Sequence, residues 1–154
     1  MTSRSARSLG ARLLQTRAFA RAPVPAFRMG LGFLFTRRLL MLEHVGRSSG
    51  TARYVVLEVV EGSGTDSLVV ASGFGPRAQW FRNLVAQPRC HVNTGLRRRV
   101  PALATVLDPA EGAAVLARYQ VEHPAAWEKL SAIITEAAGC ADPQIPLVRL
   151  SLER

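Results

Sequence analysis

The chain has 154 residues, 48% of them hydrophobic, and this length and composition fit one domain with a sizeable core. The formal net charge is +9, but it is unevenly placed: residues 1–53 hold ten arginines and one acid, whereas residues 54–154 hold equal numbers of basic and acidic residues. A neutral body with 6% aromatic residues argues against a specific nucleic-acid-binding domain. The chain contains no run of 18 apolar residues, so no transmembrane helix is expected.

Residues 1–26 are rich in Arg, Ser and Ala and contain no acidic residue. Three interpretations stay open for this segment: a disordered basic tail, a mitochondrial transit peptide, or a helix that lies on an anionic membrane surface. We expect residues 27–154 to form a single domain. The membrane interpretation depends on apolar residues that partly share one side of a helix, namely Leu9, Leu13, Phe19 and Ala20.

The remaining elements are predicted in chain order from apolar runs and from the Gly, Pro and Asp residues that end them. Phe27 to Thr36 is an apolar helix or turn. Residues 61–66 are a polar turn, so the strands on either side form a hairpin. Asp108 is a good N-cap, with Pro109 and Glu111 in the first turn of its helix. The expected strands are 38–45, 53–60, 67–72, 90–94, 98–107 and 146–152, and the expected helices are 77–86, 109–123 and 124–138.

Five or six mainly antiparallel strands with short flanking helices indicate an α+β barrel rather than a sheet of βαβ units. Two glycine-bounded loops carry the residues best suited to a ligand. In Gly46 to Gly50, followed by Arg53, backbone N–H groups, hydroxyls and arginines can cradle a phosphate. After the strand at 67–72, Gly73 and Gly75 let the backbone approach a flat ligand closely. Together the loops could hold a cofactor with an anionic tail and a planar ring.

Three motifs occur in one order along the chain: Gly-Arg-x-Ser-Gly-x-x-Arg from residue 46, Val-Ala-Ser-Gly-x-Gly from residue 70, and Trp-Phe-Arg-Asn-Leu-x-x-x-Pro from residue 80. On these motifs, residues 36–152 resemble the deazaflavin (coenzyme F420)-dependent nitroreductase and quinone reductase family. The resemblance implies a split β-barrel of the FMN-binding, pyridoxamine-oxidase-like type. It also implies an enzyme that transfers a hydride from the reduced coenzyme, rather than from FMN, to a quinone, nitro or activated-alkene acceptor.

The resemblance further implies a cytoplasmic protein, either a monomer or a homodimer. Some relatives are membrane-associated through a segment like residues 1–26, which would place this protein on the inner face of the cell membrane. Because the deazaflavin coenzyme is essentially prokaryotic, the resemblance argues against a mitochondrial transit peptide.

The resemblance also implies which residues meet the coenzyme. Its tail carries a phosphate and a polyglutamate chain, so Arg47 and Arg53 are the expected anchors. Ser72 matches the family serine near the reacting ring, and Tyr119 is a candidate proton donor because family enzymes use tyrosines from this half of the chain. The predicted coenzyme-binding residues are Arg47, Ser48, Ser49, Arg53, Tyr54, Val55, Val56, Leu57, Ala71, Ser72, Gly73, Phe74, Trp80, Phe81, Arg82 and Asn83.

The chain departs from the family pattern at three places. Family members commonly have Lys where this chain has Ser48, a change that bears on tail binding. Phe74 stands where many relatives have Gly, so it could narrow the pocket or shift substrate choice. The segment around Tyr119 does not match the family's catalytic segment.

Most of these residues also have an ordinary structural interpretation, which the sequence leaves open. The loop with Arg47 can be a hairpin loop with surface arginines. The Ser72 hydroxyl can be satisfied by the backbone at a strand end, and Trp80 can simply pack in the core. Residues 97–99, three consecutive arginines, can be a solvated hairpin tip or an anion site.

No metal site is expected, because the histidines and cysteines lack ligand spacing and the cysteines fit buried, reduced thiols. These residues are His44, His91, His123, Cys90 and Cys140. The departures from the family pattern keep a second function class open: a barrel that binds a flavin, a deazaflavin or haem without turnover.

The charge split predicts that residues 1–26 drive association with anionic lipid. Each basic residue near an anionic surface contributes about 1 kcal/mol, so even a few engaged arginines give measurable attachment. Co-sedimentation with anionic vesicles should therefore retain the full chain and lose a shortened protein that begins at Ala26. Equal behaviour of the two proteins would show that this segment is only an extension.

Overall fold

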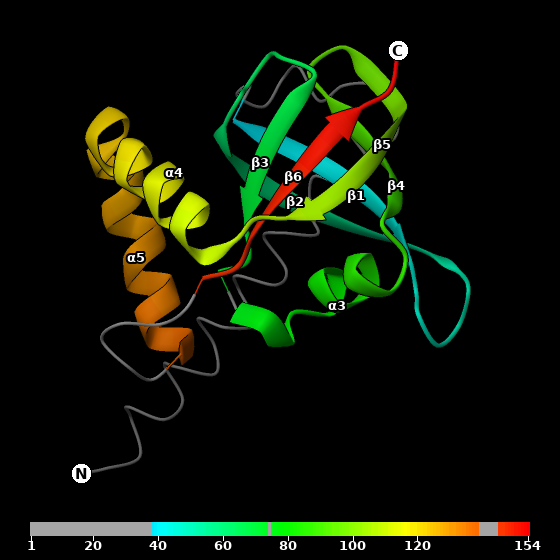
Figure 1. Ribbon diagram of the computed structural model, residues 1–154, viewed down its shortest axis with the longest axis horizontal. Helices are drawn as coiled ribbons and strands as arrows, with labels where there is room; N and C mark the ends of the chain where they lie inside the picture. The colour runs from blue at the N-terminus through cyan, green and yellow to red at the C-terminus, as the bar shows by residue number, and fades with distance from the viewer. Residues whose placement is uncertain (1–37, 74, 139–144) are drawn as a thin grey trace, which may run out of the picture.

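The structure is a computed structural model that describes residues 38–73, 75–138 and 145–154 (Figure 1). The predictions made for residues 1–36, for Phe74 and for Cys140 lie outside these ranges. Within the described residues, no helix is long and apolar enough to cross a membrane.

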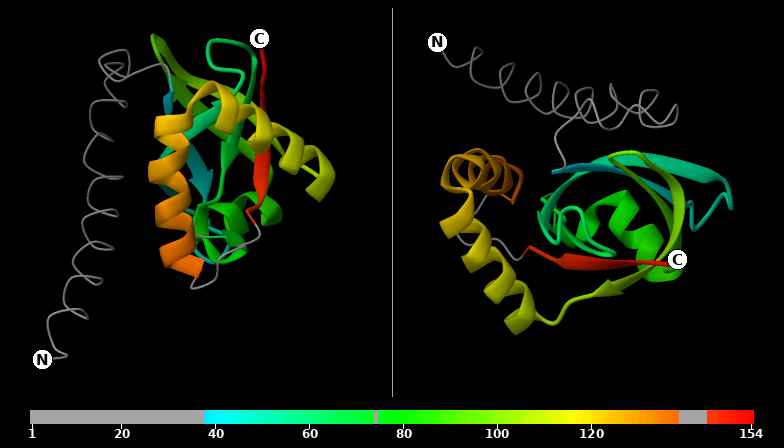
Figure 2. Two further views of the ribbon diagram at one scale, coloured as in Figure 1. Left: turned by 90° about the vertical axis from the view of Figure 1, so that its left-hand side faces the viewer. Right: turned by 90° about the horizontal axis from the view of Figure 1, so that it is seen from above.

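Six antiparallel strands close into a barrel in the order β1-β2-β3-β6-β5-β4. One end of this barrel is occupied by a short helix, and two further helices lie outside its wall (Figures 1 and 2). The strands are β1 (Leu39–Val45), β2 (Ala52–Glu61), β3 (Ser67–Ala71), β4 (Arg89–Thr94), β5 (Arg97–Val106) and β6 (Leu147–Leu152), and the helices are the 3-10 turn η2 (Gly75–Arg77), α3 (Gln79–Ala86), α4 (Pro109–Glu122) and α5 (Pro124–Ala138).

The core inside the barrel follows from the two-residue period of the strands. Leu42 on β1 pairs with Val55 on β2 and with Val92 on β4, and all three belong to one apolar cluster. Helix α3 adds Trp80 and Phe81 to the same cluster. An eight-residue helix therefore completes the core that the strands surround.

A second apolar cluster lies where α4 and α5 cover the outside of the wall (Figure 2). It joins Val60 and Val69 of the wall to Val115 and Tyr119 of α4. Partly buried Trp127 of α5 packs against it. The two helices are thus held to the barrel by burial of apolar side chains on its outer face.

The predicted α+β barrel, its six strands and its three helices are confirmed, with boundaries that differ by one or two residues. The helix expected at 77–86 begins at Gln79, because residues 75–77 form the turn η2 and Ala78, with a ψ of 132°, is not helical. Cys90 is buried, as expected, and burial raises the pKa of its thiol to about 12.

The predicted N-cap at Asp108 is also confirmed: its carboxylate accepts a hydrogen bond of 2.9 Å from the backbone N–H of Glu111. We expect Asp108→Ala to lower the free energy of unfolding by about 0.5–2 kcal/mol, measured by urea denaturation, because a free N–H of α4 loses its acceptor. Asp108→Asn keeps a side-chain oxygen and is the matched control. If alanine and asparagine behave alike, the cap does not stabilise α4.

Candidate functional site

The loop between β1 and β2 is tied to helix α3 by one arginine. The Arg47 guanidinium donates a hydrogen bond of 2.8 Å to the Asn83 Oδ1 atom and one of 2.9 Å to the Gln79 Oε1 atom. The backbone N–H of Arg47 donates a third, of 3.1 Å, to the same Asn83 oxygen. Gln79 and Asn83 are four residues apart, so one face of α3 presents both amides to the loop.

A buried histidine supports this arrangement from inside the barrel. The Nδ1 atom of His44 lies 3.1 Å from the Asn83 Nδ2 atom, and both side chains are about 95% buried. Burial, and then the charge of Arg53, lower the pKa of His44 to about 4. The imidazole is therefore neutral at pH 7, and it contacts the same asparagine that holds Arg47.

The loop itself is closed by short local hydrogen bonds. The N–H of Gly46 donates to the carbonyl of Thr51, and the N–H of Gly50 donates to the carbonyl of Gly46. Ser49 Oγ lies 2.8 Å from the Thr51 hydroxyl, and Ser48 and Ser49 are both exposed. A Cβ on Gly46 would lie 2.5 Å from Ser49 Oγ, so this position has no room for a side chain unless Ser49 moves.

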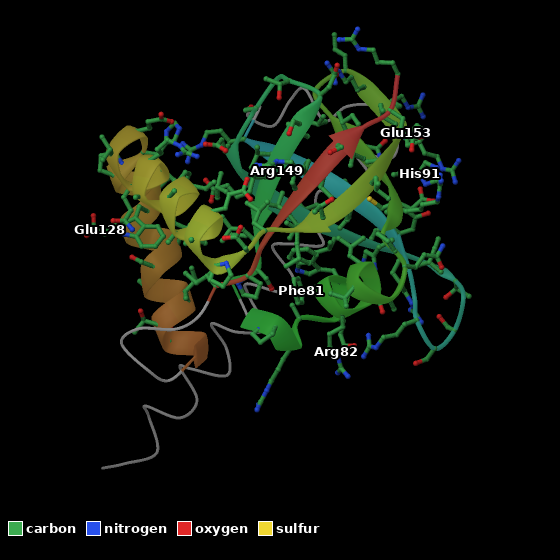
Figure 3. The ribbon with its side chains drawn as sticks, viewed as in Figure 1. Phe81, Arg82, His91, Glu128, Arg149 and Glu153 are labelled. Atoms are coloured by element: carbon green, nitrogen blue, oxygen red, sulfur yellow. The ribbon has the colours of Figure 1, made fainter. Side chains whose placement is uncertain are left out.

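The charges around the loop and α3 are of one sign. No acidic residue occurs in residues 44–57 or 67–107. Within the described ranges, none of four exposed arginines on the loop, β2, η2 and α3 has a carboxylate within 4.0 Å; these are Arg47, Arg53, Arg77 and Arg82. Figure 3 shows Arg82 on the side of α3 that faces away from the barrel.

Most arginines elsewhere in the described fold have acidic partners. In the run at 97–99, Arg97 bonds to Asp66 at 2.9 Å and Arg99 bonds to Glu43 at 3.1 Å. The hairpin-tip interpretation of this run therefore fits better than an anion site. The same contrast makes the acid-free surface beside α3 the natural place for an anion in the described residues.

The aromatic residues of the third motif face the core. Trp80 and Phe81 are each 8% exposed and make a T-shaped contact with centroids 6.1 Å apart. Figure 3 shows Phe81 on the barrel side of α3. The core-packing interpretation of Trp80 is the one that this structure shows, so the motif positions Asn83 and Arg82 by anchoring the helix.

The second predicted loop is more closed than the sequence suggested. Ser72 is fully buried, and its Oγ donates a hydrogen bond of 2.6 Å to the carbonyl of Gly75. A Cβ on Gly73 would meet Ile134 at 3.6 Å and Leu130 at 4.0 Å, so this glycine packs against α5. The Ser72 hydroxyl could contact a ring or substrate, as predicted, only if this turn opened. Gly75, by contrast, is partly exposed and is accessible without such a change.

The hydroxyl of Tyr119 is hydrogen-bonded to other side chains of the protein. Its hydroxyl donates a hydrogen bond of 2.6 Å to Glu58 Oε1, and Arg38 bonds to the same carboxylate at 2.7 Å. Burial, and then the bond to Glu58, raise the pKa of Tyr119 to about 12. In this arrangement its proton is held by Glu58, and the predicted role as a proton donor has no support from the geometry.

The predicted residues on β2 divide between two faces of the wall. Val55 and Leu57 pack on the interior cluster, so they do not form a surface. Tyr54 instead lines a hollow of about 470 Å³ on the other face. The hollow is lined by Met41, Glu43, Ala52, Tyr54, Asn93, Arg98 and Arg99. The structure therefore does not gather the whole predicted set around one cavity.

Two residues that hold the site together were absent from the predicted set. His44 follows Leu40 and Leu42 at the two-residue spacing of an inward-facing row, and this signal could have identified it as a buried polar residue. Gln79 lies four residues before Asn83, and helical spacing could have paired them. No group of three His, Cys, Asp or Glu side chains suited to a metal ion occurs within residues 38–73, 75–138 and 145–154.

Sequence comparison relates this chain to F420H(2)-dependent quinone reductases. The family of F420H(2)-dependent quinone reductases matches residues 22–134. A Mycobacterium tuberculosis (strain ATCC 25618 / H37Rv) protein, Rv3178, named as a candidate F420H(2)-dependent quinone reductase, is 36% identical over 88 residues, which are 56% of this chain and 72% of that protein.

Two solved structures show the same fold at low identity. An F420-H2 dependent reductase, FDR-A, is 23% identical with a TM-score of 0.53, over 74% of this chain and 94% of its own. A Listeria innocua protein described as a candidate pyridoxamine 5'-phosphate oxidase is 12% identical with a TM-score of 0.53, over 83% of this chain and 94% of its own. The barrel is thus of the split type predicted from the sequence. On the match over residues 22–134, the chain belongs to the family of F420H(2)-dependent quinone reductases, which are oxidoreductases that use coenzyme F420.

Proposed function

We propose that this protein binds the anionic tail of coenzyme F420 on the acid-free surface made by the Gly46–Gly50 loop, η2 and α3, and that it reduces a quinone. The observation that carries the proposal is a set of four exposed arginines, on this surface and on the adjoining start of β2, that have no acidic partner among the described residues. The bound reduced coenzyme supplies a hydride.

The start of helix α3 adds to the positive potential of this surface. Its N-cap residue, Ala78, makes no side-chain cap, and its first turn holds no acid. Its free N–H groups therefore carry the partial positive charge of a helix N-terminus. Arg77 and Arg82 are close to this helix start in sequence, and Arg47 bonds to its first residue, Gln79. No acidic residue of the described chain pairs with these three arginines. A phosphate or carboxylate would relieve the repulsion among them.

Arg47 is suited to orient such a tail rather than only to attract it. Gln79 and Asn83 fix its planar guanidinium, while N–H groups not used in those two bonds stay available for an anion. Arg53 and Arg82 carry no such fixation in the described contacts and can adapt to a longer chain of carboxylates. This division fits a ligand with one phosphate and several glutamates.

For the ring, we propose the partly exposed turn that contains Gly73 and Gly75. Ser72 stabilises this turn through its bond to the Gly75 carbonyl, so its contribution is to hold the backbone in place. We propose a quinone as the acceptor class, and we keep nitroaromatic and activated-alkene acceptors as further classes for the same assay. A barrel that only binds the coenzyme is the alternative that turnover would exclude.

The first prediction of this proposal concerns the choice of coenzyme. Titration should give a Kd for F420 at least about tenfold lower than for FMN, because the glutamates add charge-assisted bonds worth about 1.5–3 kcal/mol each. Rising salt should narrow the difference, since screening weakens exposed contacts. Adding a quinone to protein with reduced F420 should then restore the oxidised spectrum. Tighter binding of FMN would contradict the assignment, and binding without oxidation would leave a non-catalytic module.

The second prediction concerns Arg47. We expect Arg47→Ala to weaken F420 binding by about 1.5–3 kcal/mol while the thermal unfolding midpoint changes little, because the loop is exposed. Arg154→Ala is the matched control, because this exposed arginine bonds to Asp66 and lies by the C-terminus, at the end of the barrel opposite α3 (Figure 1). Equal affinity of Arg47→Ala and Arg154→Ala would place the tail elsewhere.

A further inference from the structure

The inward-facing row of β1 ends in a polar residue. Leu40 and Leu42 are fully buried apolar residues, and His44, two residues on, is 4% exposed. A buried polar ring is costly unless its ring nitrogens find partners. The partner that the structure gives to its Nδ1 atom is the Asn83 amide, at 3.1 Å.

The hydrogen bonds of Asn83 determine the orientation of its own amide and the tautomer of His44. Its Oδ1 atom faces two donors, the backbone N–H and the guanidinium of Arg47, so the atom toward the loop must be the oxygen. The Nδ2 group then faces His44 and donates. The neutral imidazole must accept this bond at Nδ1, and its own proton must be on Nε2.

This acceptor selects the orientation of the asparagine. If His44 offered no lone pair, the buried Nδ2 group would lose its partner, and a flipped amide would place Nδ2 against the two donors of Arg47. The orientation that binds the loop is therefore the orientation that His44 enforces. Residues 47–50 are all exposed, so little side-chain packing holds the remainder of the loop.

We propose that His44 is a positioning residue for coenzyme binding: through Asn83, it fixes the loop that presents Arg47 to the anionic tail. The proposal rests on the proposed function in its final step, the tail, but its first step, the order of the loop, needs no ligand. The experiment measures the two steps separately.

The variants are His44→Leu, which fills similar space without an acceptor, and His44→Asn, which restores an oxygen near the position of Nδ1. His91→Leu is the matched control, because His91 lies on β4 and is paired with Glu43 rather than Asn83. Without ligand, hydrogen exchange of the Arg47 amide should be about tenfold faster in His44→Leu, partly restored in His44→Asn, and unchanged in His91→Leu. An unchanged rate in His44→Leu would overturn the proposal.

Affinity then tests the step that involves the coenzyme. His44→Leu should weaken binding of full-length F420 about tenfold and leave unchanged the binding of the deazaflavin riboside without phosphate and glutamates. Equal losses for both compounds would overturn the positioning role. If the wild-type protein bound neither compound, the proposed function would fail, whereas the exchange result would still decide the order of the loop.

The tautomer gives a test on the unaltered protein, which keeps the proposal open to disproof if His44→Leu does not fold. Long-range ¹H–¹⁵N spectra should show His44 with an unprotonated Nδ1 and a protonated Nε2 at pH 7. A proton on Nδ1 would overturn the proposal, since that nitrogen could not accept a bond from Asn83.

Discussion

The candidate site depends on one short helix, α3, which buries apolar side chains in the barrel core and also presents two amides to the β1–β2 loop. Trp80, Phe81 and Leu84 of α3 must be buried, because they complete the core that six strands enclose. The same eight residues must present Gln79 and Asn83 to the β1–β2 loop. Helical geometry permits both, because residues three and four positions apart share a face. Packing inside the barrel thus fixes the position of two amides on α3, and these amides tie the β1–β2 loop to the helix.

The charged residues are distributed unevenly over the fold. Away from α3, arginines form ion pairs with acidic residues, as Arg99 does with Glu43 and Arg149 does with Glu111. Around α3 this pattern stops: exposed arginines lie on the loop, on η2 and on α3, and the start of α3 has no side-chain cap and no acid in its first turn. Clustered like charges repel one another and cost stability in the free protein. A surface that is unfavourable alone and favourable with an anion is the expected state of a binding site for a polyanionic tail.

The fold followed from the sequence more readily than the site did. Apolar runs, polar turns and the cap at Asp108 located nearly every element, since each signal is local. Trp80 shows why the site was harder: its motif is compatible with a pocket wall and with a core, and only the position of α3 at the barrel end decides between them. His44 shows the reverse case, because its importance comes from Asn83, 39 residues away, and no local pattern states that contact. Tyr119 likewise finds Glu58 across 61 residues, so its proton has a partner that the sequence could not name.

These two buried groups also bear on where a proton for the acceptor comes from, because hydride reduction of a quinone consumes a proton as well. A phenol whose pKa is raised to about 12 is a weaker acid than free tyrosine, and its hydrogen bond to Glu58 opposes release. A histidine whose pKa is lowered to about 4 is neutral at pH 7, and its lone pair at Nδ1 is used by Asn83. Neither group is poised to deliver a proton near neutral pH. The contacts of Tyr119 and His44 therefore give each of them a structural role, in which one hydroxyl is bound by Glu58 and one ring nitrogen accepts from Asn83, rather than a role as proton donor to an acceptor.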